Sequence, residues 1–131
     1  SQVHQLNLLG RRIMAYNLSI NTEEKYIRVD LSEELTESDI HDSMKEVLRV
    51  RQEQKLNHIL CDERQLQVRP NDSIGLATAT RISSGPYVGM KLAIIRKDFE
   101  ERLFELVANN RSGIVKVFDD EEKAKQWLRN N

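Results

Sequence analysis

Charged and hydroxyl side chains follow apolar segments of this sequence at places where they could bind a partner or accept a phosphate. Asp62 and Arg64 come at the end of one apolar segment, Arg96 follows another, and Asp72 and Ser73 open a predicted helix. A hydroxyl in the first turn of a helix suits phosphorylation, because free backbone N–H groups and the helix dipole favour the added negative charge. Ser73 is therefore a candidate phosphorylation site. The alternative is that it is simply a serine of the kind common at the start of a helix, with no role in signalling.

The same predicted helix contains Gly75, where glycine costs on the order of 1 kcal/mol relative to alanine. Close packing of the helix on a sheet is the simplest reason for it. The loops that follow parallel strands gather at one edge of a sheet, which is where such folds usually bind their ligands. We therefore expect a partner-binding surface at that edge, made by Asp62, Arg64, Asp72, Gly75 and Arg96.

The sequence carries no recognisable catalytic, metal or cofactor motif. The three histidines are scattered, and Cys61 is the single cysteine, so neither a zinc site nor an internal disulfide is expected. Phosphate-binding glycine loops and the Gly-x-Ser-x-Gly elbow are missing. The acidic run at 119–122 is typical of a helix start. We expect a protein that is not an enzyme and has no cofactor, with Cys61 as a small buried apolar residue.

Composition favours one ordinary globular domain over residues 1–131. The chain has 39% hydrophobic and 31% charged residues, with a net charge of −1. This charge balance gives no broad field for nucleic acid or acidic lipid. The chain opens without a signal-like segment, and no apolar run approaches the roughly 18 residues of a membrane helix. Cytoplasmic residence is the expectation.

The order of apolar segments predicts an α/β fold. Residues 12–20 and 25–31 form an antiparallel hairpin with a turn at 21–24, and buried strands follow at 58–62, 91–95 and 113–118. Helical patterns separate these strands, which requires parallel pairing through crossovers. The prediction is one mixed, mostly parallel five-stranded sheet.

Four helices are expected. The first begins near Thr36 with a capping box to Asp39 and carries an apolar stripe, the second covers about 70–82, and the third begins near Asp98. The last begins at Asp119 or Asp120 and buries Ala124, Trp127 and Leu128. If strands lie in chain order, right-handed crossovers crowd helices onto one face. A homodimer or the segment 6–9 could then cover the opposite face.

Three stretches of the sequence resemble the STAS domain, in particular its SpoIIAA-like group. They are Ile59-Leu60-Cys61-Asp62-x-Arg64, Lys91-Leu92-Ala93-Ile94-Ile95, and Val115-Lys116-Val117-Phe118-Asp119-Asp120 with Ala124 and Trp127-Leu128. The likeness runs from about Arg12 onward and contains no catalytic signature. It implies a non-enzymatic interaction module in bacterial signalling, of the kind that antagonises anti-sigma factors.

The resemblance also implies a switch. In STAS proteins that antagonise anti-sigma factors, a partner kinase phosphorylates the serine of an Asp-Ser-x-Gly-Leu segment, which here reads Asp72-Ser73-Ile74-Gly75-Leu76. The implied partners are an anti-sigma factor or a kinase-like protein. Binding of a small apolar ligand or lipid is the alternative function, because the fold also resembles lipid-binding domains. Met14, Met44 and Met90 could soften a pocket wall there, although core packing is their ordinary role.

Overall fold

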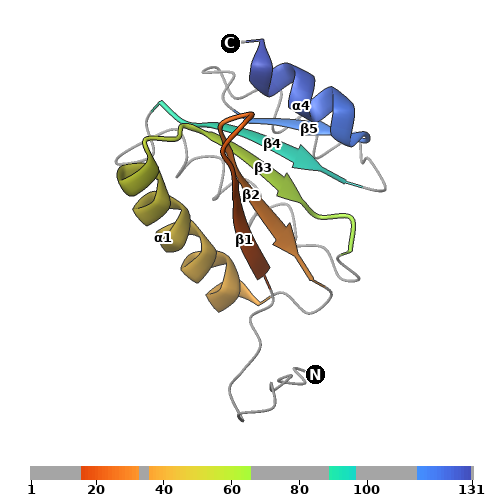
Figure 1. Cartoon of the computed structure of the whole chain (residues 1–131). Helices are drawn as coiled ribbons and strands as arrows, with labels where there is room; N and C mark the ends of the chain where they lie inside the picture. The colour runs from red at the N-terminus through yellow and green to blue at the C-terminus, as the bar shows by residue number, and fades with distance from the viewer. Residues whose placement is uncertain (1–15, 33–35, 66–88, 97–114, 131) are drawn as a thin grey trace.

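The computed structural model describes residues 16–32, 36–65, 89–96 and 115–130, which form one sheet and two helices (Figure 1). The elements in chain order are β1 (Tyr16–Asn21), β2 (Tyr26–Leu31), α1 (Glu37–Gln54), β3 (His58–Asp62), β4 (Lys91–Ile95), β5 (Val115–Phe118) and α4 (Glu121–Arg129). The helices predicted near 70–82 and after Asp98 lie outside the described residues.

The five strands lie in the sheet in the same order as in the chain. β1 pairs antiparallel with β2, whereas β2, β3, β4 and β5 pair in parallel. The sequence therefore predicted the mixed, mostly parallel sheet correctly. It also gave the bounds of β3 and β4 residue for residue, because short apolar runs between polar neighbours mark strands that are buried on both faces.

The turn between β1 and β2 lies one residue later than predicted. Asn21 still belongs to β1, where it pairs with Tyr26, and its side-chain oxygen accepts a 2.9 Å hydrogen bond from the backbone N–H of Glu24. Lys25 closes the turn in the left-handed region, with φ at 60°. Because a strand needs negative φ, β2 begins at Tyr26 instead of at Lys25.

Helix α1 begins as the sequence predicts. The Thr36 hydroxyl accepts a 3.1 Å hydrogen bond from the backbone N–H of Asp39, and the Asp39 carboxylate accepts one of 3.0 Å from the backbone N–H of Thr36. This reciprocal pair is a capping box. The helix ends at Lys55, whose left-handed backbone, with φ at 59°, lets its N–H donate back to the Arg51 carbonyl at 2.8 Å.

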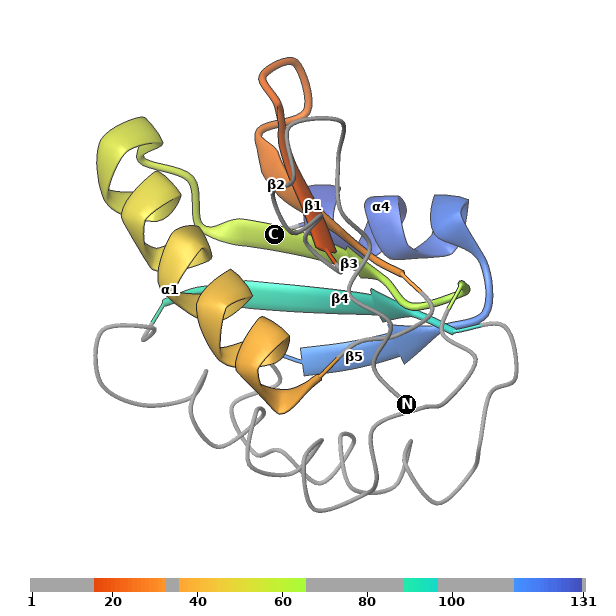
Figure 2. The ribbon, with the colours of Figure 1, turned by 90° about the horizontal axis from the view of Figure 1, so that it is seen from below.

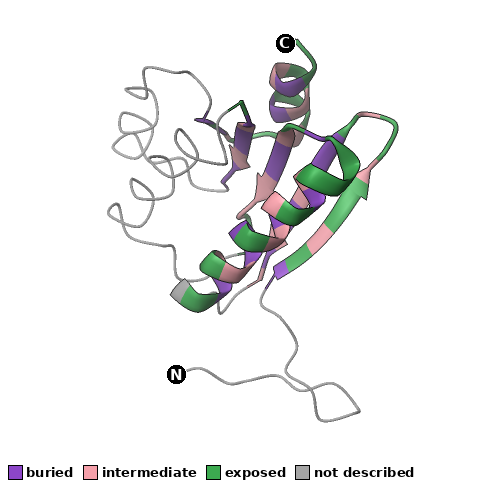
Figure 3. Cartoon of the chain, turned by 90° about the vertical axis from the view of Figure 1, so that its left-hand side faces the viewer, coloured by how far each residue is buried: buried purple, intermediate pink, exposed green. Residues whose placement is uncertain are grey.

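The larger core lies between α1 and one face of the sheet (Figure 2). Met44, Val47 and Val50 of α1 are buried against it, and Met90, just before β4, is fully buried there. Burial follows the helical period, so that the outward side of α1 is exposed (Figure 3). The methionines at 44 and 90 therefore pack in the core, whereas Met14 lies outside the described residues.

The opposite face of the sheet is covered by α4 (Figure 2). Ala124 and Leu128 of this helix are buried against Leu60, Ala93 and Ile95 of the sheet. The sequence leaves a homodimer or residues 6–9 as possible cover for this face, and in the structure α4 packs there against β3, β4 and β5. The sequence leaves this open because α4 follows an edge strand and leads to no further described strand, so the crossover rule does not fix its side. Residues 6–9 lie outside the described part.

Two side chains are less buried than predicted. Trp127 is half-buried at the rim of the α4 side, with its ring centroid 5.8 Å from that of Phe118 and 4.1 Å from the Lys91 ammonium nitrogen. Cys61 keeps part of its surface accessible but packs against the α1-side core. Burial raises the pKa of its thiol well above the usual value, so the thiol stays protonated. In the described ranges, neither helix is long and apolar enough to cross a membrane.

Candidate functional site at the carboxyl edge of the sheet

The residues that directly follow β3 and β4 are hydrogen-bonded to the ends of the neighbouring strands at the carboxyl edge of the sheet. Beyond β3, the backbone N–H of Glu63 donates to the Ile95 carbonyl at 2.9 Å. Beyond β4, the backbone N–H of Arg96 donates to the Phe118 carbonyl, also at 2.9 Å. Asp62, Arg64 and Arg96 therefore lie at one edge, as their positions after the strands led us to expect. Asp72, Ser73 and Gly75 lie outside the described residues.

An ionic network joins this edge to β2 and α4. We call it the Arg28 cluster; its members are Arg28, Asp30, Asp62, Arg64, Glu121 and Lys125. Arg28 is its centre, with its Nη2 atom 2.9 Å from an Asp62 oxygen and 3.0 Å from a Glu121 oxygen. One guanidinium thus ties β2, β3 and the first turn of α4 together.

Arg64 makes the second connection of the cluster. Its Nε and Nη2 atoms donate to the two carboxylate oxygens of Asp62 at 3.0 and 2.7 Å, and its backbone N–H adds a third bond at 3.0 Å. The same Nη2 atom lies 3.0 Å from Glu121. A two-oxygen fork of this kind fixes the plane of a guanidinium as well as its position. Arg64 is nevertheless 39% exposed, so it remains reachable from solvent.

The register of the sheet explains why Arg28 is needed. Alternation places Arg28 and Asp30 of β2 on the α4 side, and the parallel register sets Asp30 directly beside Asp62. Two carboxylates side by side on neighbouring strands repel each other. The Arg28 Nε atom bonds Asp30 at 3.0 Å while its Nη2 atom bonds Asp62, so one cation relieves the repulsion.

Helix α4 supplies the third acid of the cluster. Asp120 caps this helix by accepting a 3.0 Å hydrogen bond from the backbone N–H of Lys123, which places Glu121 in the first turn. Lys125, one turn later, lies 3.1 Å from Glu121. The acidic run of the sequence therefore divides its roles between helix capping by Asp120 and the ionic network through Glu121.

The six residues of the Arg28 cluster carry three positive and three negative charges, and Lys125 also lies 3.8 Å from Glu122, outside the cluster. Burial alone would raise the pKa of Asp62, but hydrogen bonds from Arg64 and the charge of Arg28 outweigh it and lower that pKa. The hydrogen bond from Arg28 lowers the pKa of Glu121, against a smaller opposing effect of burial. Both carboxylates are therefore ionised at neutral pH.

We expect these lowered pKa values to make the fold sensitive to acid. The folded chain holds protons on Asp62 and Glu121 less tightly than the unfolded chain, whose carboxyl groups titrate near about pH 4. The stabilisation is therefore complete above about pH 5 and is lost as the pH falls through the lower native pKa values. Urea unfolding at several pH values measures it. Asp62→Asn should reduce the decline in stability between about pH 5 and pH 3, and an unchanged decline would contradict this account.

Arg96 lies at the same edge but is not a surface residue. It is 4% exposed, and its Nε atom lies 3.0 Å from an oxygen of Glu63. The two side chains form an ion pair, but the Nε–H bond of Arg96 does not point at the Glu63 oxygen closely enough to make a hydrogen bond. Arg96 is therefore placed to hold the strand ends together, whereas Arg64 and Asp30 are the more exposed residues of this edge.

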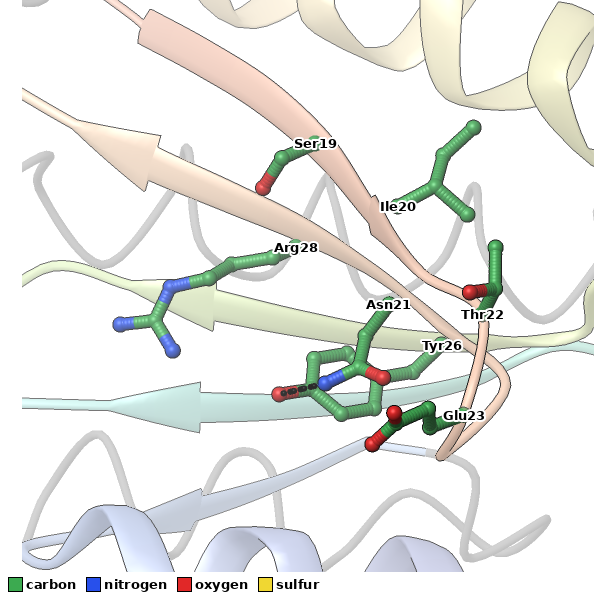
Figure 4. Close-up of a pocket in the computed structure, with 7 residues that line it drawn as sticks. All are labelled: Ser19, Ile20, Asn21, Thr22, Glu23, Tyr26 and Arg28. Atoms are coloured by element: carbon green, nitrogen blue, oxygen red, sulfur yellow. Dashed lines mark hydrogen bonds between the residues drawn. The ribbon is translucent and has the colours of Figure 1, made fainter.

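A shallow groove of about 360 Å³ runs beside the Arg28 cluster along β1. It is lined mainly by polar side chains from both strands of the hairpin and its turn, with Arg28 at one end (Figure 4). Near the other end, the Asn21 amide donates a 3.3 Å hydrogen bond to the Tyr26 hydroxyl. Over the described ranges, no group of three or more His, Cys, Asp or Glu side chains is arranged to hold a metal ion.

Sequence reasoning missed four members of this site, which are Arg28, Asp30, Glu121 and Lys125. The alternation of β2 places Arg28 on the polar face of its strand, and the position of Glu121 after Asp120 marks a first helical turn. Those signals were readable. These signals do not show that Asp30 pairs with Asp62, or on which side of the sheet α4 packs, because both depend on tertiary structure.

Solved structures similar to this chain share its architecture. The NMR structure of the protein TM1081 matches with a TM-score of 0.60 and 18% sequence identity, over 100% of this chain and 98% of that one. The crystal structure of an anti-sigma factor antagonist from Mycobacterium paratuberculosis matches with a TM-score of 0.53 and 10% identity, over 87% of this chain and 94% of that one. This chain has a STAS-like fold. At sequence identities of 18% and 10%, the similarity to these structures shows the fold alone.

No family model and no curated protein matches the sequence. The assignment of the STAS-like fold therefore rests on the chain-ordered mixed sheet and on these structural likenesses. It agrees with the SpoIIAA-like resemblance seen in the strand segments at 59–64, 91–95 and 115–120.

Proposed function

We propose that this chain is a non-enzymatic STAS-type interaction module that binds a protein partner at the carboxyl edge of its sheet. The observation that carries the proposal is the Arg28 cluster, a network of short ion pairs that ends in the exposed side chain of Arg64 and the partly exposed side chain of Asp30. Cations and carboxylates alternate there with no net charge, which suits a protein surface of mixed charge better than a polyanion. The structural likeness to an anti-sigma factor antagonist supports the same choice.

The proposed regulation is phosphorylation of Ser73 by a kinase-like partner. A phosphate adds about −1.5 to −2 charges at neutral pH. Because the Arg28 cluster is balanced, its carboxylates already occupy its cations, and a phosphate nearby would make the edge strongly negative. A partner with an acidic binding surface would then be repelled. We place this activity in bacterial signalling, with an anti-sigma factor or its kinase as the partner and the cytoplasm as the location.

Binding of an apolar ligand or lipid receives less support from the described residues. Met44 and Met90, two of the methionines that could have softened a pocket, pack in the core beneath α1. The groove along β1 is shallow, and most of the side chains that line it are polar. We therefore favour the protein-binding function.

We expect the protein purified from its own cells to carry phosphate on Ser73, detected by mass spectrometry. Quantitative affinity purification should recover the same partner with wild type and Ser73→Ala and much less of it with Ser73→Asp, because the added charge weakens docking. The control is Gln126→Glu, which adds one negative charge to the exposed side of α4 and should retain the partner. Equal recovery with Ser73→Asp, together with phosphate found elsewhere and not on Ser73, would refute the switch.

A further inference from the structure

Strand β1 is an edge strand of the described sheet, and its own residues lack the usual protection. Within the described part of the chain it pairs only with β2, along all six of its residues. Natural edge strands are commonly kept from pairing with other chains by charged residues, proline or short length. β1 has no charged residue and no proline. β5, at the other end of the sheet, has four residues and carries the exposed Lys116.

The exposed side chains of β1 also favour contact with another strand. Asn17, Ser19 and Ile20 are exposed, and in Figure 3 β1 lies at the margin of the sheet with green segments along it. Ile20 is 37% exposed, and among the described residues it is the large apolar side chain that lies exposed on the surface. The extended backbone of β1 is fixed from its inner side, because β2 pairs along it and the Tyr16 hydroxyl donates a 2.8 Å hydrogen bond to Glu46 of α1.

We propose that β1 pairs antiparallel with β1 of a second copy of this chain, joining two sheets into one. The strand is self-complementary for this arrangement. Leu18 and Ile20 lie on the α1 side, whereas Asn17, Ser19 and Asn21 lie on the α4 side. A twofold axis at Leu18 or at Ser19 sets apolar side chains opposite apolar ones and polar opposite polar. Neither register places two like charges together.

The groove along β1 fits the same arrangement. Ser19, Ile20 and Asn21 help to line it, so the polar side chains of a second β1 on the α4 side would lie at its open margin (Figure 4). The occupant is a second copy because the strand matches itself, and strand addition gives main-chain hydrogen bonds without any particular sequence motif. This association uses the opposite margin of the sheet from β5, and its test does not involve Ser73.

Analytical ultracentrifugation of the full chain tests the proposal with two charge-reversed double variants. Asn17→Lys/Ser19→Lys and Asn17→Glu/Ser19→Glu each place like charges opposite one another in a β1–β1 pair. Each should raise the dimer dissociation constant on the order of tenfold relative to wild type. An equimolar mixture of the two should restore dimers, because the charges then attract. Gln126→Lys, on the exposed side of α4, is the control and should dimerise as wild type does.

The positions changed are exposed, but Asn17 lies beside Asp30 and Ser19 beside Arg28 on β2, so each double variant gains one attractive and one repulsive neighbour. Circular dichroism and thermal unfolding should therefore show that each variant keeps its fold. A wild-type chain that stays monomeric at several hundred micromolar would overturn the proposal. So would dimers that both charge variants form as tightly as wild type, because the contact would then lie elsewhere. Capture of a different protein by β1, lost in both variants and not regained in their mixture, would replace the second copy with that partner.

Discussion

Replacing Arg28 by methionine is expected to lower the free energy of unfolding by about 2 kcal/mol. Methionine keeps much of the apolar stem but removes the cation that bonds Asp30, Asp62 and Glu121. Three carboxylates would then share two cations, and Asp30 and Asp62 would stand side by side without Arg28 between them. Removing one partner of a buried ion pair costs about 3–5 kcal/mol, and the 23% exposure of Arg28 reduces that figure.

Urea unfolding measures this loss, and Arg49→Met is the matched control. Arg49 also contacts carboxylates, those of Glu46 and Glu53 on its own helix, but it is 56% exposed. Exposed pairs of this kind contribute about 0–1 kcal/mol. Arg28→Met should therefore cost clearly more than Arg49→Met. Equal losses would mean that the Arg28 cluster is an ordinary surface network and would remove the physical basis for a rigid docking edge.

Leu60→Ala is expected to destabilise the chain by about 3 kcal/mol, because it leaves a cavity under α4. Leu60 is fully buried between β3 and α4, where Ala93, Ala124 and Leu128 surround it. The small residues among these neighbours have little side chain with which to fill the space. Since small domains have only about 5–15 kcal/mol of total stability, this one change removes a large part of it.

The matched control for the cavity is Leu48→Ala in α1. Leu48 is only partly buried against the other core, so its loss should cost about 1 kcal/mol in the same urea measurement. The ratio of the two effects tests whether α4 is firmly docked on the sheet. If Leu60→Ala cost no more than Leu48→Ala, α4 would pack loosely, and Glu121 would not be held against Arg28.

The sequence carried enough information for most of the architecture. β3 and β4 were readable because each is a short apolar run between polar residues, and α1 because Thr36 and Asp39 make a capping box. The turn after β1 was misplaced by one residue because the left-handed backbone of Lys25 has no signal in its residue type. The side taken by α4 could not be predicted, because the crossover rule does not apply to a helix that leads to no further described strand.

Only part of the candidate site could be predicted from the sequence, for a related reason. Asp62 and Arg64 could be placed at the carboxyl edge because they follow a predicted strand. Arg28 lies 34 residues before Asp62 and 93 residues before Glu121, so no local pattern connects the three. Their meeting depends on the strand register and on the docking of α4. Those are packing outcomes, and a single sequence does not display them.

The long separation between Arg28 and Glu121 also bears on how the protein is made. Each strand pairs with the one synthesised just before it, so the sheet can grow from β1 outward as the chain leaves the ribosome. Glu121 is synthesised 93 residues after Arg28, and until then Arg28 and Arg64 lack one of their carboxylate partners. The nascent chain also exposes Leu60 and Ala93 until α4 arrives. Docking of α4 therefore marks a late step of biosynthesis, and a stalled nascent chain would present a ready target for chaperones and proteases.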